Sequence, residues 1–186
     1  LAGQAIEWME ADAQELPFED NSADLVVCSF GYMFLPDKVK GFAEARRILK
    51  PGGKLLFTTW DRLEVNGASL VQRTIAGKYL GNDVPHNYNL AFSMNNEGEI
   101  RGWLQSAGFK TIDIESVEKT AKAASASAMA GGLTLGGSMY NMLMQRNPDW
   151  VPLIKKEIEE ELAKKFGEAP VMSPMRAVFV TATKEH

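Results

Sequence analysis

Hydrophobic and polar positions alternate between strand-like and helix-like patterns along the chain. Residues 24–30 (DLVVCSF) are almost continuously apolar, which is typical of a central strand covered on both faces in a parallel sheet. Asp37 can cap a helix whose apolar residues recur at three- and four-residue spacing up to Leu49, before a Pro-Gly-Gly stop. Residues 54–60 (KLLFTTW) predict a second buried strand, so this region is a strand–helix–strand unit with parallel strands.

The same patterns predict further elements on both sides of this unit. Residues 110–117 (KTIDIESV) alternate strictly, which indicates a half-exposed strand at a sheet edge. Strand and helix signals in alternation predict an α/β layered fold, taken as a single domain over residues 1–186. The other predicted elements are strands at residues 5–10 and 175–183 and helices at residues 69–80, 96–108 and 147–167.

Composition narrows the function classes. The chain has 186 residues, 45% of them hydrophobic and 24% charged, which suits one globular domain. A net charge of −4 disfavours binding to nucleic acid as a primary role. The single cysteine, Cys28, cannot form an intrachain disulfide, so we expect a reducing, cytoplasmic setting. No apolar run approaches the roughly 18 to 20 residues that span a bilayer, and we expect no membrane span.

Several familiar site motifs do not fit. The segment GGLTLGG at residues 131–137 lacks the Lys-Ser/Thr pair of a phosphate-binding loop. We expect no metal, because no set of His, Cys and carboxylate residues has ligand spacing. Cys28, inside an apolar strand, is interpreted as an inert buried thiol.

In open parallel sheets, ligands bind beyond the carboxyl ends of the strands. Two places qualify. At Asp12-Ala13, a carboxylate could accept from an exocyclic amine while a backbone N–H donates to a ring nitrogen, a pair that can recognise adenine. At Ser29-Phe30-Gly31, backbone carbonyls could accept from a ligand ammonium and the Phe30 ring could form a pocket wall.

The order of short motifs resembles class I S-adenosylmethionine-dependent methyltransferases, of the quinone-biosynthesis-like type 11 group. The motifs are Asp-Ala at residues 12–13, Leu-Pro-Phe at 16–18, Ser-Phe-Gly at 29–31, Ala-Arg-Arg-Ile-Leu-Lys-Pro-Gly-Gly at 45–53 and the closing strand. The resemblance implies a Rossmann-like sheet with helices on both faces. It also implies methyl transfer from S-adenosylmethionine to a small, partly hydrophobic molecule, whose identity and methylated atom the sequence does not reveal.

Carried across residue by residue, the resemblance implies that Asp12 binds the adenine amine, that Ala13 supplies a backbone N–H, and that Ser29 and Phe30 line the methionine end. Ordinary structural roles remain open: Asp12 can cap a helix at residues 13–16, and Ser29 and Phe30 can be strand-end packing. His86 is a weak candidate base, with a solvated loop histidine as the alternative. Residues 62–95 and 122–170 are expected to be substrate-covering insertions and helices.

The family's glycine-rich turn and ribose-binding acid would lie before Leu1, so the resemblance implies a domain lacking its first two βα units. We then expect an unpaired edge at residues 24–30, and either weak or no binding of S-adenosylmethionine or a homodimer formed through that edge. The alternatives are a non-catalytic truncated α/β domain that serves as an interaction or assembly module, and a nucleotide-dependent oxidoreductase.

Overall fold

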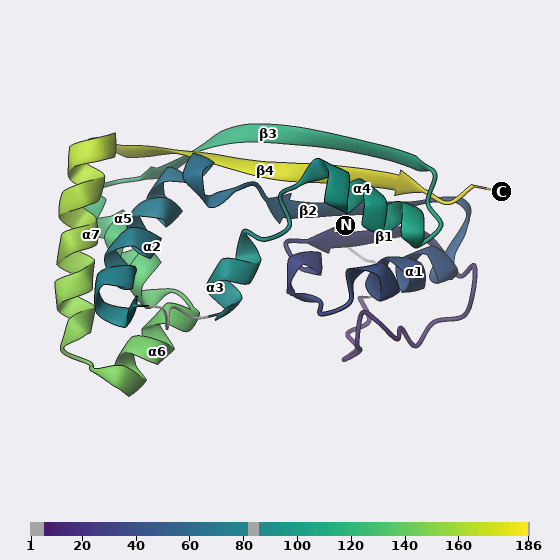
Figure 1. Ribbon diagram of the computed structural model, residues 1–186, viewed down its shortest axis with the longest axis horizontal. Coiled ribbons are helices and arrows are strands. Elements are labelled where there is room, and N and C mark those ends of the chain that lie inside the picture. The colour runs from purple at the N-terminus through teal and green to yellow at the C-terminus, as the bar shows by residue number, and fades with distance from the viewer. Residues whose placement is uncertain (1–5, 82–85, 186) are drawn as a thin grey trace.

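A single four-stranded sheet organises the chain. The computed structural model describes residues 6–81 and 86–185 (Figure 1). The strand order is β1-β2-β4-β3, with β1 parallel to β2 and with β4 antiparallel to both of its neighbours. The strands are β1 (Ala23–Ser29), β2 (Leu49–Trp60), β3 (Thr111–Ala123) and β4 (Val171–Thr183). The Rossmann-like α/β class is confirmed.

The helices begin where the sequence supplies caps. Asp37 accepts from the Lys40 N–H at 2.9 Å and starts α1, and Asn96 accepts from the Glu99 N–H at 3.1 Å and starts α4. Both predicted caps are therefore confirmed. The helices are α1 (Lys38–Ile48), α2 (Gly67–Leu80), α3 (His86–Ala91), α4 (Glu97–Ser106), α5 (Ala126–Leu135), α6 (Ser138–Arg146) and α7 (Trp150–Phe166), with 3-10 turns η1 (Tyr32–Phe34) and η2 (Leu63–Val65). None of these described helices combines the length and apolar character needed to cross a membrane.

Two hydrophobic cores divide the molecule. In the first, α1 and α4 pack on the sheet around Phe42, Phe57 and Leu104, and we call this region the sheet half. In the second, α2, α5, α6 and α7 surround Ile154 and Ile158, and we call this region the helical half. Figure 1 shows β3 and β4 running from one half into the other, and β4 supplies Val178 and Val180 to the first core and Val171 to the second.

A buried polar cluster fixes the junction of the two halves. Asp61, just after β2, accepts from the Arg176 Nε on β4 at 2.6 Å. Asn66 donates to the carbonyls of Asp61 and Arg62 and accepts from the Arg176 N–H at 3.0 Å. Since Asp61 and Asn66 are both buried, these bonds replace water and set how α2 leaves the sheet.

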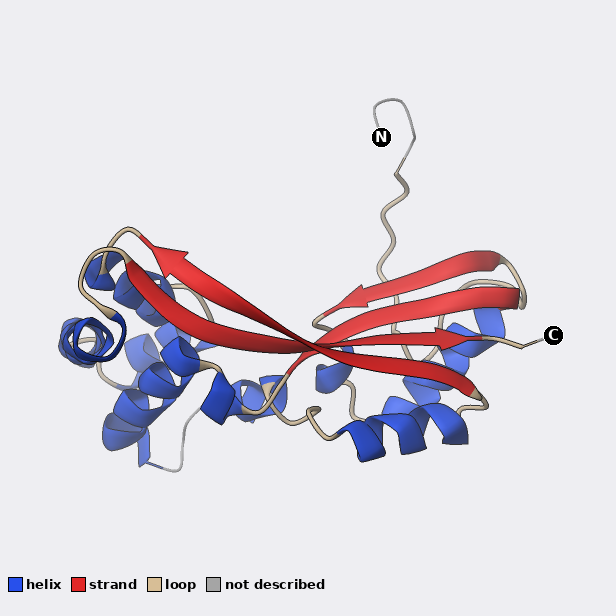
Figure 2. Cartoon of the chain, turned by 90° about the horizontal axis from the view of Figure 1, so that it is seen from above, coloured by secondary structure: helices blue, strands red, loops and turns tan. Residues whose placement is uncertain are grey.

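The strand β1 corrects one expectation. Its sequence predicts a central strand covered on both faces, yet it forms one edge of the described sheet. Val26 and Cys28 pack on the first core, whereas Leu25 and Val27 are 50% and 64% exposed. Figure 2 shows the helices gathered on one face of the sheet, and α1 and α4 both pack on that face. The helices expected on both faces are therefore found on one, and the expected unpaired edge is present among the described strands.

The N-terminal segment also departs from expectation. Residues 6–10 form no strand, although residues 5–10 are predicted to form one, and residue 5 lies outside the described part. A strand needs a hydrogen-bonded neighbour, and no described strand lies beside this segment. Other strands are longer than predicted. β2 starts at Leu49, directly after α1, where Leu49 pairs with Ala23, and β3 runs on to Ala123, because it pairs with β4 along its whole length.

Candidate functional site

The carboxyl end of β1 turns sharply. The Phe30 N–H donates to the Thr58 carbonyl on β2 at 3.1 Å, and Phe30 has a positive φ of 55°. A side chain on Gly31 would put a Cβ 2.6 Å from the Cys28 Sγ, so glycine is required for this close approach. Ser29 is exposed, with its Oγ 3.4 Å from the Thr58 Oγ1. The turn therefore places Ser29 at the end of β1 and Phe30 directly after it.

Aromatic rings continue from this turn across the sheet. Phe30 stacks on Trp60 at the end of β2, with ring centroids 4.3 Å apart and planes 23° apart. Trp60 lies 6.5 Å from Phe92, which lies 5.8 Å from Tyr88 on α3. Such pairs are favourable beyond the area that they bury, by roughly 0.5–1.5 kcal/mol each. The four rings, here called the aromatic wall, link the ends of two parallel strands to a helix of the region 62–95.

Asp12 caps a turn and no helix. Its Oδ1 accepts from the Gln14 N–H at 2.8 Å, and its carbonyl accepts from the Glu15 N–H at 3.0 Å. Asn or Asp side chains commonly bond the backbone two residues on in this way. The described hydrogen bonds use neither Asp12 Oδ2 nor the Ala13 N–H, the two groups that adenine recognition would need.

The Asp12 turn is held near the loop that follows β1. The Gln14 Oε1 accepts from the Asp37 N–H at 3.1 Å, which ties the turn to the residue that caps α1. Glu44 accepts from the Leu16 N–H at 2.8 Å, and hydrogen bonds from Arg47 hold the pKa of its carboxyl below the usual range. No described hydrogen bond joins Asp12 or Ala13 directly to Ser29 or Phe30. The structure thus brings the two predicted pairs to one end of β1 without direct contact.

Other residues near the strand ends have structural roles. Tyr32 and Met33 are buried in the first core, and burial raises the pKa of Tyr32 well above its usual range. Burial also raises the pKa of the Cys28 thiol, which disfavours the reactive thiolate.

His86 begins α3, but its side chain lies outside the described residues. Within the described part, His, Cys, Asp and Glu side chains form no group that could hold a metal.

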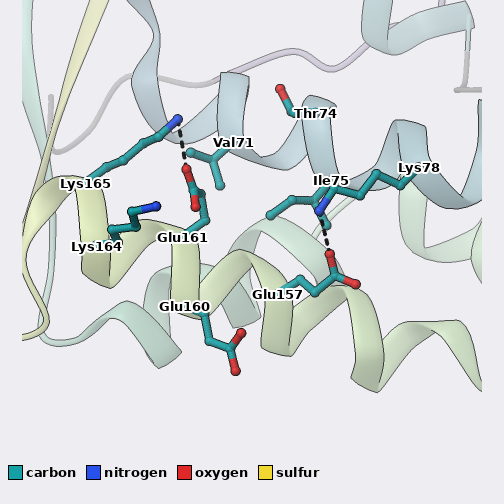
Figure 3. Close-up of a pocket in the computed structure, with 9 residues that line it drawn as sticks. All are labelled: Val71, Thr74, Ile75, Lys78, Glu157, Glu160, Glu161, Lys164 and Lys165. Carbon is teal, nitrogen blue, oxygen red and sulfur yellow. Dashed lines mark hydrogen bonds and ion pairs between the residues drawn. The ribbon is translucent and has the colours of Figure 1, made fainter.

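A charged hollow between α2 and α7 is structural. Figure 3 shows Lys78 of α2 pointing at Glu157 of α7, and their Nζ and Oε2 atoms are 2.8 Å apart. Glu157 also accepts from the Tyr79 hydroxyl, and the Lys78 bond holds the pKa of Glu157 below its usual range. Within α7, Glu161 pairs with Lys165 at 3.1 Å. The Lys78–Glu157 pair joins α2 to α7. Because these charges are already paired, they offer few free hydrogen-bonding groups to a ligand.

Sequence reasoning missed Gln72 and Tyr88. Gln72 lies on α2 among the buried apolar positions Val71, Ile75 and Ala76, and it is itself buried. Tyr88 donates toward Gln72 Oε1 at 3.0 Å. The available signal was a polar residue on the apolar face of a helix, because such a residue is retained only with a hydrogen-bonding partner.

Comparisons with known proteins agree with this geometry. The family described as a methyltransferase domain matches residues 1–57. A relative, the ubiquinone/menaquinone biosynthesis C-methyltransferase UbiE of Escherichia coli, is 30% identical over 118 residues, which cover 58% of this chain and 47% of the relative. The chain therefore spans about half the length of the curated relatives it matches.

Solved structures show the same fold at low identity. A Bacillus halodurans protein assigned as a methyltransferase has a TM-score of 0.58 and 18% identity, covering 100% of this chain and 74% of that chain. A SAM-dependent methyltransferase from Thermotoga maritima has a TM-score of 0.50 and 18% identity, covering 95% of this chain and 63% of that chain. The resemblance that the motif order indicated is confirmed.

Proposed function

Because this chain is related to the class I S-adenosylmethionine-dependent methyltransferases, we propose that the whole protein methylates a small, partly hydrophobic molecule, using S-adenosylmethionine. The observation that carries the proposal is the aromatic wall at the carboxyl ends of β1 and β2, where an open parallel sheet binds its ligand. The family match over residues 1–57 supports the same chemistry independently.

Four residues are proposed to hold the cofactor. The Asp12 carboxylate accepts from the adenine amine through Oδ2 and the Ala13 N–H donates to the ring, since the described hydrogen bonds use neither of these two groups. Ser29 and Phe30 line the methionine end, beyond the end of β1. The Phe30 ring is held in place by its stack on Trp60, so this wall is formed before the ligand arrives.

Methyl transfer asks mainly for positioning. S-adenosylmethionine, when bound, would supply a sulfonium methyl group for in-line attack by the acceptor, with the neutral thioether as the leaving group. Alignment of the two reactants alone contributes a large part of such an acceleration, about 7–11 kcal/mol in well-oriented systems. A base is needed only where the acceptor must lose a proton, and His86 at the start of α3 is proposed for that role. Its test is the pH profile of turnover in His86→Gln.

The regions 62–95 and 122–170 are proposed to cover the acceptor. The first contributes α2 and α3, and the second contributes α5, α6 and α7, which pack together around the second core. Tyr88 supports the proposal for the first region, because it belongs both to α3 and to the aromatic wall. Cys28, with its partly buried thiol, fits the reducing, cytoplasmic setting that we propose.

We propose that two copies associate through β1. Its outer edge has no described neighbour, and Leu25 and Val27 lie exposed beside it. Open edges with exposed apolar side chains recruit other chains. Sedimentation of the wild-type chain at rising concentration tests this proposal. We expect the wild type to form a dimer and Val27→Lys to remain a monomer. A wild type that stays monomeric at every concentration would contradict the proposal.

The same edge favours a second candidate function. A non-catalytic α/β domain that acts as an assembly module would use β1 and its exposed face without any cofactor. Calorimetry separates the two candidates, because only the methyltransferase binds S-adenosylmethionine.

The cofactor sites are tested on the whole protein, with the 186-residue chain measured beside it. Asp12→Asn keeps an oxygen for the Gln14 N–H but removes the charge, so the turn survives while S-adenosylmethionine binding weakens by roughly tenfold. Asp24→Asn is the matched control, because Asp24 is exposed at the other end of β1. Equal affinity in wild type and Asp12→Asn would remove Asp12 from the site.

A further inference from the structure

A cavity of about 450 Å³ lies where the two halves meet. We call it the interlobe cavity. It is lined by Phe34 of η1, Gln72 of α2, Tyr88 and Ala91 of α3, Leu133 of α5 and Met139 of α6, together with the two glycines between α5 and α6. Its volume falls within the range of small-molecule sites, about 300–1,000 Å³.

The cavity adjoins the aromatic wall. Phe34 follows the end of β1 by one short turn, and Tyr88 belongs to both the wall and the cavity lining. In Figure 1, α3 lies between the sheet half and α6, which matches the contacts of α3 with η1 and with α6. The space therefore lies next to the strand ends at which the cofactor is proposed to bind.

The lining selects against charge. None of the described residues that line the cavity is charged, and most of them offer apolar or aromatic surface. A charged ligand group would lose its water without gaining an opposite charge, which is costly. Burial raises the pKa of Tyr88, so its hydroxyl stays protonated at neutral pH and adds no charge.

Two acceptors beside the cavity share one donor. The Tyr88 hydroxyl lies 2.6 Å from the Ser69 carbonyl and 3.0 Å from the Gln72 Oε1, but it carries one hydrogen for these two acceptors. The Gln72 amide cannot simply flip, because its Nε2 donates to the Leu133 carbonyl and lies 3.8 Å from the Met139 Sδ. When the hydrogen goes to Ser69, Gln72 Oε1 is left without a partner.

We propose that the interlobe cavity binds the methyl acceptor, and that this acceptor is a neutral, flat, largely apolar molecule with an O–H or N–H group that donates to Gln72 Oε1. Only the identification of the ligand as the methyl acceptor rests on the proposed function. The preference for a neutral donor-bearing ring follows from the lining itself, so it can be measured without any cofactor.

Three probes test the chemistry by ligand-observed NMR titration of the 186-residue chain. The probes are 2-naphthol, 2-methoxynaphthalene, which has the same ring without a donor, and 2-naphthoate, which carries a charge. We expect 2-naphthol to bind roughly tenfold more tightly than 2-methoxynaphthalene, the cost of a buried acceptor left unpaired. We expect 2-naphthoate to bind more weakly than 2-naphthol. The reverse order for either pair would overturn the proposal.

Variants locate the binding. Gln72→Met removes the acceptor and should abolish the difference between 2-naphthol and 2-methoxynaphthalene, whereas Tyr88→Phe leaves Gln72 Oε1 in place and should keep it. Ala91→Phe should fill the cavity, and Ala128→Phe, on the exposed side of α5, is its size-matched control. Binding of 2-naphthol that survives Ala91→Phe unchanged would place the probe elsewhere and overturn the assignment.

Two checks keep these results interpretable. Ala91 also packs against the first core, so Phe34→Ala gives a second measurement: Phe34 is 45% exposed, and its loss should weaken 2-naphthol binding without unfolding the chain. Calorimetry with S-adenosylmethionine is run separately on the whole protein, for which the cofactor is proposed. Selective 2-naphthol binding without cofactor binding would reject the proposed function and retain the cavity's preference for a neutral donor. Cofactor binding without selective 2-naphthol binding would retain the proposed function and reject that preference.

Discussion

The two halves of the molecule differ in how completely they are enclosed. In the sheet half, α1 and α4 cover one face of the sheet, while Leu25 and Val27 on β1 face outward. In the helical half, four helices close around Ile154 and Ile158. The half with the recognisable sequence is thus the more open one. This teaches that a family signature and a closed core are separate properties, and that the candidate site draws on both halves.

Substitutions that shorten a buried side chain in either core should have the largest effects on the free energy of unfolding. They also test whether the two halves unfold together. Ile154→Ala on α7 should cost about 2–5 kcal/mol, and Phe42→Ala on α1 about 3–5 kcal/mol, because both side chains are fully buried. Urea unfolding followed by circular dichroism measures both. We expect one cooperative transition in each case, since β4 contributes buried side chains to both cores.

Leu153→Ala is the matched control within α7. Leu153 is 51% exposed beside the buried Ile154, so its loss should stay within about 0.5 kcal/mol. Two separate transitions in Ile154→Ala would instead show that the helical half unfolds alone.

The sequence predicted the sheet half better than the helical half, and the reason lies in the patterns. The caps at Asp37 and Asn96 and the apolar repeat of α1 are local signals, and all were confirmed. The segment holding α5 and α6 is rich in Ala, Gly and Ser, which gives no clear periodicity, so helices were expected within residues 122–170 but α5 and α6 were not located there. Both helices pack against α7, and such packing is not visible in the local sequence pattern of either helix.

The candidate site was predictable only in part. Ser29 ends β1 and Phe30 follows it, at the strand end where the sequence predicted them, because this position depends on the strand alone; their role in binding stays a prediction. The interlobe cavity depends on Gln72 meeting Tyr88 and Leu133 from three helices, and a single sequence carries no signal for such a meeting. The exposure of Val27 was missed for another reason. An apolar pattern shows that both faces of a strand are suited to burial, but it does not show which elements cover them.

Overpacking at the start of α2 should give an intermediate effect. A Cβ on Gly67 would lie 2.6 Å from the Phe166 Cζ and 2.9 Å from the Ser173 Oγ, which accepts from the Ala68 N–H. Gly67→Ala should therefore cost about 1–3 kcal/mol of unfolding free energy. Gly102→Ala on α4 is the contrast in the sheet half: its Cβ meets nothing within 4 Å, so it should stabilise by about 0.5–1 kcal/mol. A similar sign for both would contradict this account.

Helix caps allow an equal comparison between the halves. Asp37 caps α1 in the sheet half, and Ser125 caps α5 by accepting from the Ala128 N–H at 3.1 Å. Replacement of either by Ala should cost about 1 kcal/mol in urea unfolding. Asp37→Asn and Ser125→Asn retain a capping oxygen and should cost little. A loss from Asn as large as that from Ala would show that the cap is not the cause.

The smallest expected difference between the halves is in how much stability each loses at acidic pH. Hydrogen bonds from Arg47 lower the pKa of Glu44 in the sheet half, and those from Lys78 and Tyr79 lower the pKa of Glu157 in the helical half. A pKa lowered by folding stabilises the fold fully above the unfolded value, near 4.5, and that contribution is lost as pH falls through the folded value.

Glu44→Gln and Glu157→Gln should each flatten the loss of stability on acidification, by less than about 1 kcal/mol because such pairs are partly screened by water. Urea midpoints measured from pH about 5 to about 3 would show it. The effect of Glu44 should be the larger, since its carboxylate also accepts from the Leu16 N–H and Arg47 in turn bonds the Phe18 carbonyl. Protonation of Glu44 thus loosens the loop that carries Asp12, whereas protonation of Glu157 loosens two helices that the second core still holds. Equal flattening by both variants would mean that this loop adds nothing to the stability of the sheet half.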